Sequence, residues 1–313
     1  MRAEQPKKPS PSMGEGLGGG GVSGKTPPFI DVHPTPTPPH QGEGLVRRVL
    51  ADGAARLAAV SDTPRLDAEL LMAHALGIER ETLLLRRLDD SVPASFAALL
   101  DRRLAHEPVA YITGRRAFWT IALEVGPGVL IPRPDSEALI EAAVVRFGKA
   151  GPRRILDLGT GPGTLLLAAL DQWPEASGLG VDGSPAALAY ARRNGDARAE
   201  FRLGDWGEAI AERFDLILCN PPYVEAGADL PPDVARYEPD AALYAGPDGL
   251  DCYRLLAPQF RALLAPGGIV CLEIGAGQES AVSALMAAEG FTIESRMDLK
   301  GIARCLVLSV DPE

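Results

Sequence analysis

The tetrad Asn220-Pro221-Pro222-Tyr223, which we call the acceptor tetrad, combines hydrogen-bond acceptors with a stiff backbone. Proline fixes its own φ angle and has no N–H group, so the Pro221 carbonyl has few local partners and can accept a hydrogen bond from a ligand. The side-chain oxygen of Asn220 is a second acceptor. Two acceptors match the two hydrogens of an NH2 group, and the ring of Tyr223 can lie against a planar group.

An NH2 group held in this way belongs to an amide or an aromatic amine, whose nitrogen is a poor nucleophile because its lone pair is delocalised. Binding both hydrogens would aim the lone pair or π face of that nitrogen at a neighbouring methyl sulfonium. The protein can supply orientation and charge stabilisation. No histidine or glutamate base is needed in the tetrad, because the proton can leave after the methyl group has arrived. The tetrad therefore predicts methyl transfer to nitrogen, and the alternative is a Pro-Pro turn that only closes a strand.

A glycine-rich turn, Gly159-Thr160-Gly161-Pro162-Gly163, follows the apolar segment 155–158 and precedes an apolar helix. Glycine permits positive φ angles and close approach of a ligand to the backbone. Open α/β sheets bind ligands at the carboxyl ends of their strands, where this turn is expected. Its G-x-G-x-G spacing, with Thr164 next, differs from the G-x-G-x-x-G of pyrophosphate binders. The turn predicts a cofactor site, and the alternative is a tight connection without a ligand.

Asp182 ends the next predicted strand, and Asp205 and Trp206 follow the strand after it. Asp182 is placed to accept hydrogen bonds from both hydroxyls of a ribose, which indicates an adenosine-containing cofactor. The alternative is that Asp182 caps the following helix, a role that Ser184 can fill. Asp205 could bind an adenine amine, and Trp206 could lie against the adenine ring or serve only in packing.

From Pro134 onward, apolar runs alternate with helical patterns, which predicts an α/β domain with a mostly parallel sheet covered on both faces. The expected helices are 136–148, 163–172, 185–194, 250–264 and 278–289. The expected strands are 154–158, 178–182, 200–203, 214–219 and 268–274, followed by an edge pair, 291–295 and 303–310.

The first part of the chain has a different character. Residues 45–108 show helical spacing, with capping side chains and a proline in 61–64, a stop at Gly77 and a second helix from Ala94 to His106. Residues 1–44 are rich in Gly and Pro and cannot bury enough apolar area to offset their ordering entropy, so we expect this segment to be disordered.

Between these regions the period changes to that of a strand. Apolar residues alternate with polar or small ones from Trp119 to Val125. The segment Gly126-Pro127-Gly128 then provides a turn, and Val129-Leu130-Ile131 is expected to return as a second strand. A β-hairpin would thus join the helical region to the α/β domain.

The 313 residues carry a net charge of −11. A duplex DNA or long RNA partner usually leaves a basic footprint, so we expect no direct nucleic-acid binding, and an acidic surface fits a basic protein partner better. The four cysteines and four histidines show no zinc-binding spacing, so no metal is expected. The sequence shows neither a membrane-spanning apolar stretch nor a secretory signal, which by elimination predicts a cytoplasmic enzyme.

Taken together, these motifs resemble known families. The glycine turn with Asp182 is similar to the class I, seven-stranded methyltransferase fold. The acceptor tetrad is similar to that of amino-methyltransferases acting on adenine, cytosine or glutamine nitrogens. Three further segments resemble the HemK family of peptide chain release factor N(5)-glutamine methyltransferases, a match that spans about residues 45–310: RLDAELL at 65–71, EPVAYITG at 107–114 and IPRPDSE at 131–137.

The resemblance implies methyl transfer from S-adenosylmethionine to the glutamine of the Gly-Gly-Gln motif of class 1 release factors. It implies a helical substrate-recognition domain at 45–113, a β-hairpin linker at 114–133 and a catalytic domain at 134–313, with the segment 132–137 covering the active site. The acceptor tetrad would hold the glutamine amide. The residues implied to hold S-adenosylmethionine are Gly159, Thr160, Gly161, Pro162, Gly163, Asp182, Trp206 and Asn220.

Three other functions share parts of this sequence pattern. A ribosomal-protein glutamine methyltransferase shares the tetrad, but the segment Arg133-Pro134-Asp135 and the start of the helical domain favour the release-factor enzyme. A DNA adenine methyltransferase also shares the tetrad, but the acidic charge argues against it. A catalytically silent S-adenosylmethionine-binding module or RNA-binding scaffold is opposed by the intact Asn220 tetrad. The connection from Asn194 to Phe201 is shorter than is usual in the family.

Overall fold

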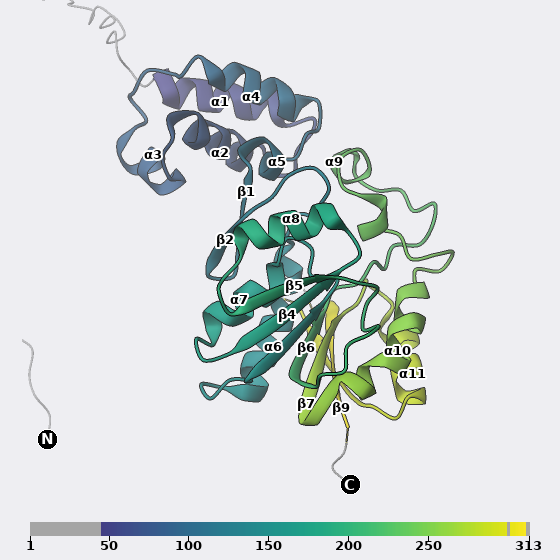
Figure 1. The fold of residues 1–313 in the computed structure, drawn as a ribbon. Helices are drawn as coiled ribbons and strands as arrows, with labels where there is room; N and C mark the ends of the chain where they lie inside the picture. Colours follow the sequence, from purple (N-terminus) through teal and green to yellow (C-terminus); the bar gives the residue numbers. More distant parts are fainter. Residues whose placement is uncertain (1–44, 299–300, 311–313) are drawn as a thin grey trace, which may run out of the picture. The chain divides into compact units, whose positions relative to one another are not determined.

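A seven-stranded sheet in the order β5-β4-β3-β6-β7-β9-β8 forms the centre of the α/β region (Figure 1). The computed structural model describes residues 45–298 and 301–310, so the segment 1–44, for which disorder is expected, lies outside the described residues. The strands β3 to β7 run parallel, and β9 runs antiparallel to both β7 and β8. The strand bounds are β3 Arg154–Leu158, β4 Ser177–Asp182, β5 Ala199–Leu203, β6 Phe214–Cys219, β7 Leu264–Glu273, β8 Thr292–Met297 and β9 Ala303–Ser309.

The mostly parallel sheet predicted from the sequence is confirmed, with β3 and β6 at the expected residues. The central strands are nearly continuous apolar runs, as expected for a parallel sheet that helices cover on both faces. Helices α6, α7 and α8 pack on one face, and α10 and α11 pack on the other. The helix bounds are α6 Glu137–Phe147, α7 Thr164–Gln172, α8 Pro185–Asn194, α10 Asp251–Leu263 and α11 Glu279–Ala288, with short helices η1 Pro134–Ser136, α9 Pro232–Ala235 and η2 Asp240–Ala242.

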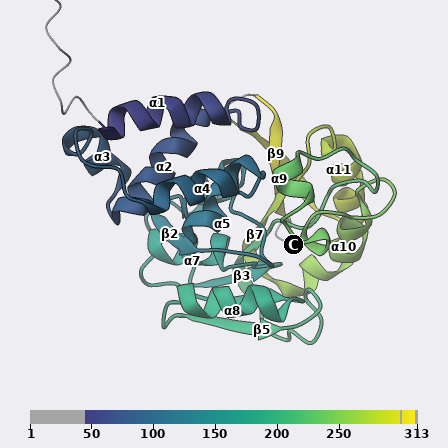
Figure 2. The ribbon, with the colours of Figure 1, turned by 90° about the horizontal axis from the view of Figure 1, so that it is seen from above.

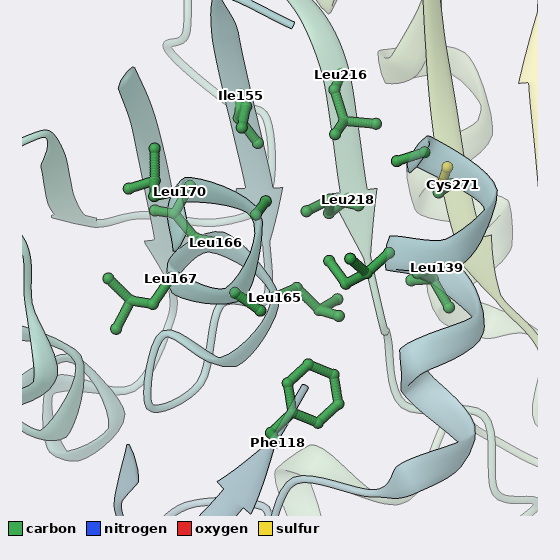
Figure 3. Close-up of a cluster of buried hydrophobic side chains, with 14 of the residues drawn as sticks. Phe118, Leu139, Ile155, Leu165, Leu166, Leu167, Leu170, Leu216, Leu218 and Cys271 are labelled. Atoms are coloured by element: carbon green, nitrogen blue, oxygen red, sulfur yellow. The ribbon is translucent and has the colours of Figure 1, made fainter. Parts of the chain in front are cut away.

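Alternate residues of the strands enter different cores, because successive side chains point to opposite faces of a sheet. Leu216 and Leu218 of β6 join the core beneath α6 and α7, whereas Ile217 and Cys219 join the core beneath α10 and α11. Figure 3 shows the first core, where side chains of β3, β6, α6 and α7 gather together with Phe118. This double cover fixes the carboxyl ends of the central strands, where the predicted site residues lie.

The N-terminal helices form a core of their own, and they cluster together in both ribbon views (Figure 2). Their bounds are α1 Leu45–Leu57, α2 Pro64–Leu76, α3 Arg80–Arg86, α4 Ser95–Leu104 and α5 Val109–Thr113. Gly77 ends α2 with a φ angle of 65°, as its position predicts. The hydroxyls of Ser61 and Thr63 do not cap the helix backbone but bond to the carboxylate of Asp67. Asp67 is buried, and it pairs with the buried Arg103 of α4 at 2.8 Å.

The predicted β-hairpin exists, but its position was wrong. The strands are β1 Arg115–Phe118 and β2 Ile121–Glu124, so the turn lies at Trp119-Thr120 and not at 126–128. Trp119 adopts a φ angle of 53°, and its backbone N–H donates to Glu137 at 2.9 Å. The segment 129–131 is not a strand, because its backbone bonds to side chains instead: the Val129 carbonyl accepts from Tyr111, and the Ile131 N–H donates to Glu238.

None of the described helices combines the length and apolar character that crossing a bilayer requires.

Candidate functional site

A cavity of about 410 Å³ opens at the carboxyl ends of β3, β4, β5 and β6. Loops from separate parts of the chain also line it, including residues 128–136 and 239–242. The structure therefore brings the glycine turn and the acceptor tetrad to one cavity, although some 60 residues separate them in the sequence. The predicted residues that line it are Gly159, Thr160, Gly161, Pro162, Asp182, Asp205, Trp206, Asn220 and Pro222, whereas Gly163, Pro221 and Tyr223 lie outside its lining.

Two glycines of the turn have different structural roles. Gly163 is the N-cap of α7 with a φ angle of 89°, and a Cβ there would approach Leu167 to 2.8 Å. Glycine is therefore required at position 163 by the backbone angle and by packing against α7. Gly159 has a φ angle of 73°, and a Cβ there would lie 3.2 Å from the ring of Trp206. A side chain at Gly159 would push against one wall of the cavity, so this glycine keeps the site open.

Asp182 is held with its carboxylate beside the glycine turn. Oδ2 accepts the N–H of Gly161 and Oδ1 accepts the N–H of Ser184, both at 2.8 Å. Ser184 itself caps α8 by accepting the N–H of Ala187 at 3.2 Å, so Asp182 is not required as the side-chain cap. Each carboxylate oxygen has a further lone pair, which leaves Asp182 able to accept ligand hydroxyls from the cavity. Burial raises the pKa of this carboxyl.

Asp157 is a cavity residue that the sequence analysis missed. It is the fourth residue of β3 and only 1% exposed. Oδ2 accepts hydrogen bonds from the Thr160 hydroxyl at 2.7 Å and from the Leu166 N–H at 3.1 Å, but Oδ1 has no partner among the described residues. Burial raises the pKa of the carboxyl to about 7. A buried, unpaired acceptor in a cavity wall fits a cationic or donor-rich part of a ligand.

The loop after β5 forms another wall. Trp206 and Ala209 are non-glycine residues with φ angles of 51° and 59°, a conformation that costs about 1–2 kcal/mol per residue. The loop is held in place by the Gly207 N–H, which donates to Gln259 of α10 at 2.9 Å. The ring of Trp206 lies close to Gly159, and both residues line the cavity. This arrangement gives the cavity a flat aromatic surface, and Asp205 lines the same cavity.

The acceptor tetrad directly follows β6 and keeps both of its acceptors free. Nδ2 of Asn220 donates to the Ser136 hydroxyl at 3.0 Å, so the amide oxygen is the atom left for a ligand. Neither that oxygen nor the Pro221 carbonyl accepts a hydrogen bond from any residue that the structure describes. The Tyr223 hydroxyl donates to Glu273 at 3.3 Å, and burial raises its pKa. Tyr223 is therefore a neutral phenol, and its hydroxyl points away from the cavity.

The segment 132–137 lies along the cavity and is anchored by several elements. Arg133 pairs with the buried carboxylate of Glu238. Asp135 pairs with Arg304 of β9 at 3.1 Å, and Ser136 accepts the bond from Asn220. Glu137 accepts the N–H of the hairpin residue Trp119. These contacts connect the hairpin, the sheet and the acceptor tetrad through a single short segment.

The cavity thus offers one group of each kind that a nucleoside with a charged amino end would need. Asp182 can accept two hydroxyls, Trp206 offers a flat surface, and Asp157 adds a buried carboxylate oxygen that has no partner among the described residues. Metal binding has no comparable support, since the part of the chain that the structure describes holds no group of three or more potential ligands from His, Cys, Asp or Glu.

Comparisons with known proteins agree with this architecture. A family model described as PrmC N-terminal domain matches residues 48–114, and one described as methyltransferase domain matches residues 152–295. A release factor glutamine methyltransferase of Rhodospirillum rubrum is 42% identical over 309 residues, covering 94% of this chain and 91% of the relative. One of Cereibacter sphaeroides is 45% identical, covering 79% of this chain and 91% of the relative.

Among solved structures, the hMettl16 catalytic domain in complex with a MAT2A 3′UTR hairpin aligns with a TM-score of 0.53. It is 14% identical and covers 68% of this chain and 83% of that chain. This likeness concerns the fold alone, and together with the family models it confirms the class I methyltransferase fold expected from the sequence.

Proposed function

Because this chain belongs to the release factor glutamine methyltransferase family, we propose that it methylates the side-chain amide nitrogen of the glutamine in the Gly-Gly-Gln motif of class 1 peptide chain release factors. The methyl donor in this proposal is S-adenosylmethionine. The observation that carries the proposal is that Asn220 and Pro222 of the acceptor tetrad line the same cavity as residues 159–162 of the glycine turn. One wall can thus hold the donor while the other presents oxygens to an amide.

The residues fit S-adenosylmethionine at each of its parts. Asp182 would accept the ribose hydroxyls, and Trp206 would lie against the adenine, whose amine could reach Asp205. The unpaired Oδ1 of Asp157 would accept the ammonium of the methionine part, which would explain why a buried carboxylate is kept there. When bound, this cofactor supplies an electrophilic methyl group on a sulfonium. The glycine turn would let the cofactor lie against the backbone.

The acceptor tetrad would bind the substrate through its two free oxygens. The amide oxygen of Asn220 and the carbonyl of Pro221 would each accept one hydrogen of the glutamine NH2 group. Fixing both hydrogens sets the plane of the amide, so the face of the nitrogen is presented in one direction. The same oxygens would stabilise the positive charge that develops on the nitrogen as the new N–C bond forms and the S–C bond to the methyl group breaks, with the electron pair of that bond going to the sulfur of the departing thioether. Afterwards the nitrogen loses one of its hydrogens as a proton to water.

The N-terminal helices would hold the release factor beside this site. They contact the segment at α9, because the Tyr237 hydroxyl donates to the Ala105 carbonyl at 3.0 Å and Arg103 lies 3.6 Å from Asp233. A protein bound across both surfaces would be positioned relative to the acceptor tetrad. Such a substrate would be met in the cytoplasm, and the proposed reaction requires neither a membrane nor direct contact with nucleic acid.

The proposal is tested by offering the purified full-length chain and labelled S-adenosylmethionine three separate acceptors: a class 1 release factor, ribosomal protein and duplex DNA. We expect label in the release factor alone. A release factor whose motif glutamine is replaced by alanine is the matched control and should remain unlabelled. Label in ribosomal protein or in DNA, with none in the release factor, would contradict the proposal.

A further inference from the structure

We propose that Gln278 is a positioning residue for the acceptor tetrad, because its side-chain amide holds the carbonyl of Tyr223 and thereby sets the direction of the Pro221 carbonyl. The inference rests on the proposed function and deepens it, since it explains what keeps the amide slot in one shape before a substrate arrives. Gln278 directly precedes α11 and does not line the cavity, so it would act on the substrate only through the tetrad.

The tetrad has few backbone hydrogen bonds with which to keep its own shape. Pro221 and Pro222 have fixed φ angles but no N–H groups, so the direction of their carbonyls depends on ψ angles that the two ends of the tetrad must fix. Strand β6 holds the first end, because Asn220 directly follows its last residue. Of the four carbonyls in the tetrad, only that of Tyr223 accepts a hydrogen bond from the described residues, and the donor is Nε2 of Gln278 at 3.0 Å.

The amide of Gln278 has one orientation that satisfies its neighbours. Its Oε1 accepts the N–H of Gly275 at 3.0 Å, and the Tyr253 hydroxyl of α10 lies 3.4 Å from the same oxygen. Its Nε2 donates to the carbonyl of Tyr223 at 3.0 Å and to that of Gly249 at 3.3 Å. A flipped amide would set its NH2 group against an N–H and its oxygen against two carbonyls. Hydrogen bonding therefore fixes which atom of Gln278 faces the tetrad.

Two glycines leave room for this arrangement. Gly249 is buried with a φ angle of 71°, and a Cβ there would collide with the Tyr223 carbonyl. A Cβ on Gly275 would lie 2.6 Å from Oε1 of Gln278 and 3.1 Å from Cδ2 of Tyr223. Because glycine has no side chain, backbone, ring and amide can approach each other closely at both positions. The last residue of the tetrad thus packs against two segments, 249–253 and 273–278, that only the fold brings to it.

The peptide unit after the tetrad shows what the bond from Gln278 adds. The Val224 N–H donates to the Leu243 carbonyl at 2.9 Å, and the Tyr223 carbonyl of the same planar unit accepts from Gln278. A single hydrogen bond would let this unit rotate about the bonded N–H, whereas bonds at both ends fix its plane. With that plane fixed, the ψ angles of the two prolines have little freedom, and the Pro221 carbonyl keeps one direction.

The decisive variant is Gln278→Glu in the full-length enzyme. Glutamate has nearly the same shape and can accept the Gly275 N–H, but its carboxylate has no hydrogen for the Tyr223 carbonyl. We expect kcat on the release factor, counted per S-adenosylmethionine site in calorimetry, to fall about 10- to 100-fold, as when an oriented group is misplaced. The KM for release factor and the affinity for S-adenosylmethionine should be unchanged. Gln278→Ala, which removes the amide without adding a charge, should lower kcat in the same way.

Hydrogen exchange and a matched control separate positioning from general stability. In both Gln278 variants the backbone N–H groups of residues 223–226 should exchange about 10-fold faster or more, whereas the rest of the sheet keeps its protection. Val282→Ala is the control, because Val282 is buried in the same helix and its backbone bond to Gln278 does not depend on its side chain. It should lower Tm by leaving a cavity but leave kcat per cofactor site unchanged well below Tm.

The outcomes distinguish this role from the proposed function. A wild-type enzyme that does not methylate release factor would refute the proposed function and this role with it. An active wild type, with either Gln278 variant folded and equal to it in kcat, would refute only the role of Gln278. A comparable loss of kcat in Val282→Ala, or a loss of cofactor affinity that accounts for the lower activity of the Gln278 variants, would show that Gln278 is merely structural.

Discussion

Replacing Asp157 by Asn should stabilise the free protein while weakening cofactor binding. Asp157 is 1% exposed, and burial raises its pKa to about 7. In the unfolded chain an aspartate has a pKa of about 3.9. Below that value both states hold the proton and the residue has no pH-dependent effect on stability. As pH rises from about 4 to about 7, the unfolded state loses its proton first, so the free energy of unfolding falls.

The magnitude follows from the difference between the two pKa values. About three pKa units correspond to about 4 kcal/mol of destabilisation once both states are ionised. Asparagine is neutral at every pH, but it gives the donors Thr160 and Leu166 weaker, uncharged hydrogen bonds. The net gain at pH 8 is therefore expected to be about 1–3 kcal/mol, a rise in Tm of about 3–8 °C. At pH 4 the gain should vanish.

The assay is thermal and urea unfolding of cofactor-free protein at pH 4, 6 and 8, combined with calorimetry of S-adenosylmethionine binding at pH 8. Loss of the carboxylate should weaken binding about 10- to 100-fold, since an ammonium would lose its charged partner. Asp52→Asn on α1 is the control, because Asp52 is exposed. A variant that is less stable than wild type at pH 8 and binds the cofactor equally well would show that the Asp157 carboxylate neither destabilises the free protein nor binds the ammonium.

Three further predictions concern the acceptor, the helical domain and the N-terminal segment. Asn220→Ala should retain S-adenosylmethionine binding but lose at least about 100-fold in kcat, as expected when an oriented hydrogen-bonding group is removed; near wild-type methylation would contradict the amide slot. Arg103→Ala should lower the free energy of unfolding, measured by urea titration, by about 3–5 kcal/mol, because it leaves the carboxylate of Asp67 buried without a counter-charge. The control is Arg56→Ala at an exposed ion pair, which should change the free energy of unfolding by less than about 1 kcal/mol. Removal of residues 1–44 should leave methylation of release factor intact, since every residue assigned to the site lies beyond them, and a large drop would show that this segment contributes.

The central sheet could be predicted because its local signals agree with its tertiary structure. Strands β3 and β6 are short apolar runs buried on both faces, and helices with clear starts and stops separate them. The hairpin was misplaced because the alternation of apolar residues continues through its turn. What fixes the turn at Trp119 is a pair of distant contacts, from its backbone to Glu137 and from its ring nitrogen to Gln172. Such contacts leave no mark in the local pattern.

Site residues whose type alone indicates chemistry were predicted from the sequence. Residues whose chemical role depends on their burial were missed. Glycines and an Asn-Pro-Pro-Tyr run are conspicuous in the sequence. Asp157 and Glu273 are single acidic residues in apolar strands, and nothing in the sequence shows that they are buried beside a cavity or beside Tyr223. Ser136 acquires its importance from Asn220, 84 positions away. Contacts between residues so far apart in the sequence can be identified only once the fold is known.

Mapping the methylated atom tests whether the acceptor tetrad orients a glutamine amide. Release factor incubated with the enzyme and S-adenosylmethionine would be digested and its Gly-Gly-Gln peptide fragmented in a mass spectrometer. We expect one added methyl group on the glutamine side chain with wild-type enzyme, and none with Asn220→Ala. A methyl group on any other residue, or equal methylation by the variant, would contradict the claim that two free oxygens at the end of β6 orient a glutamine amide.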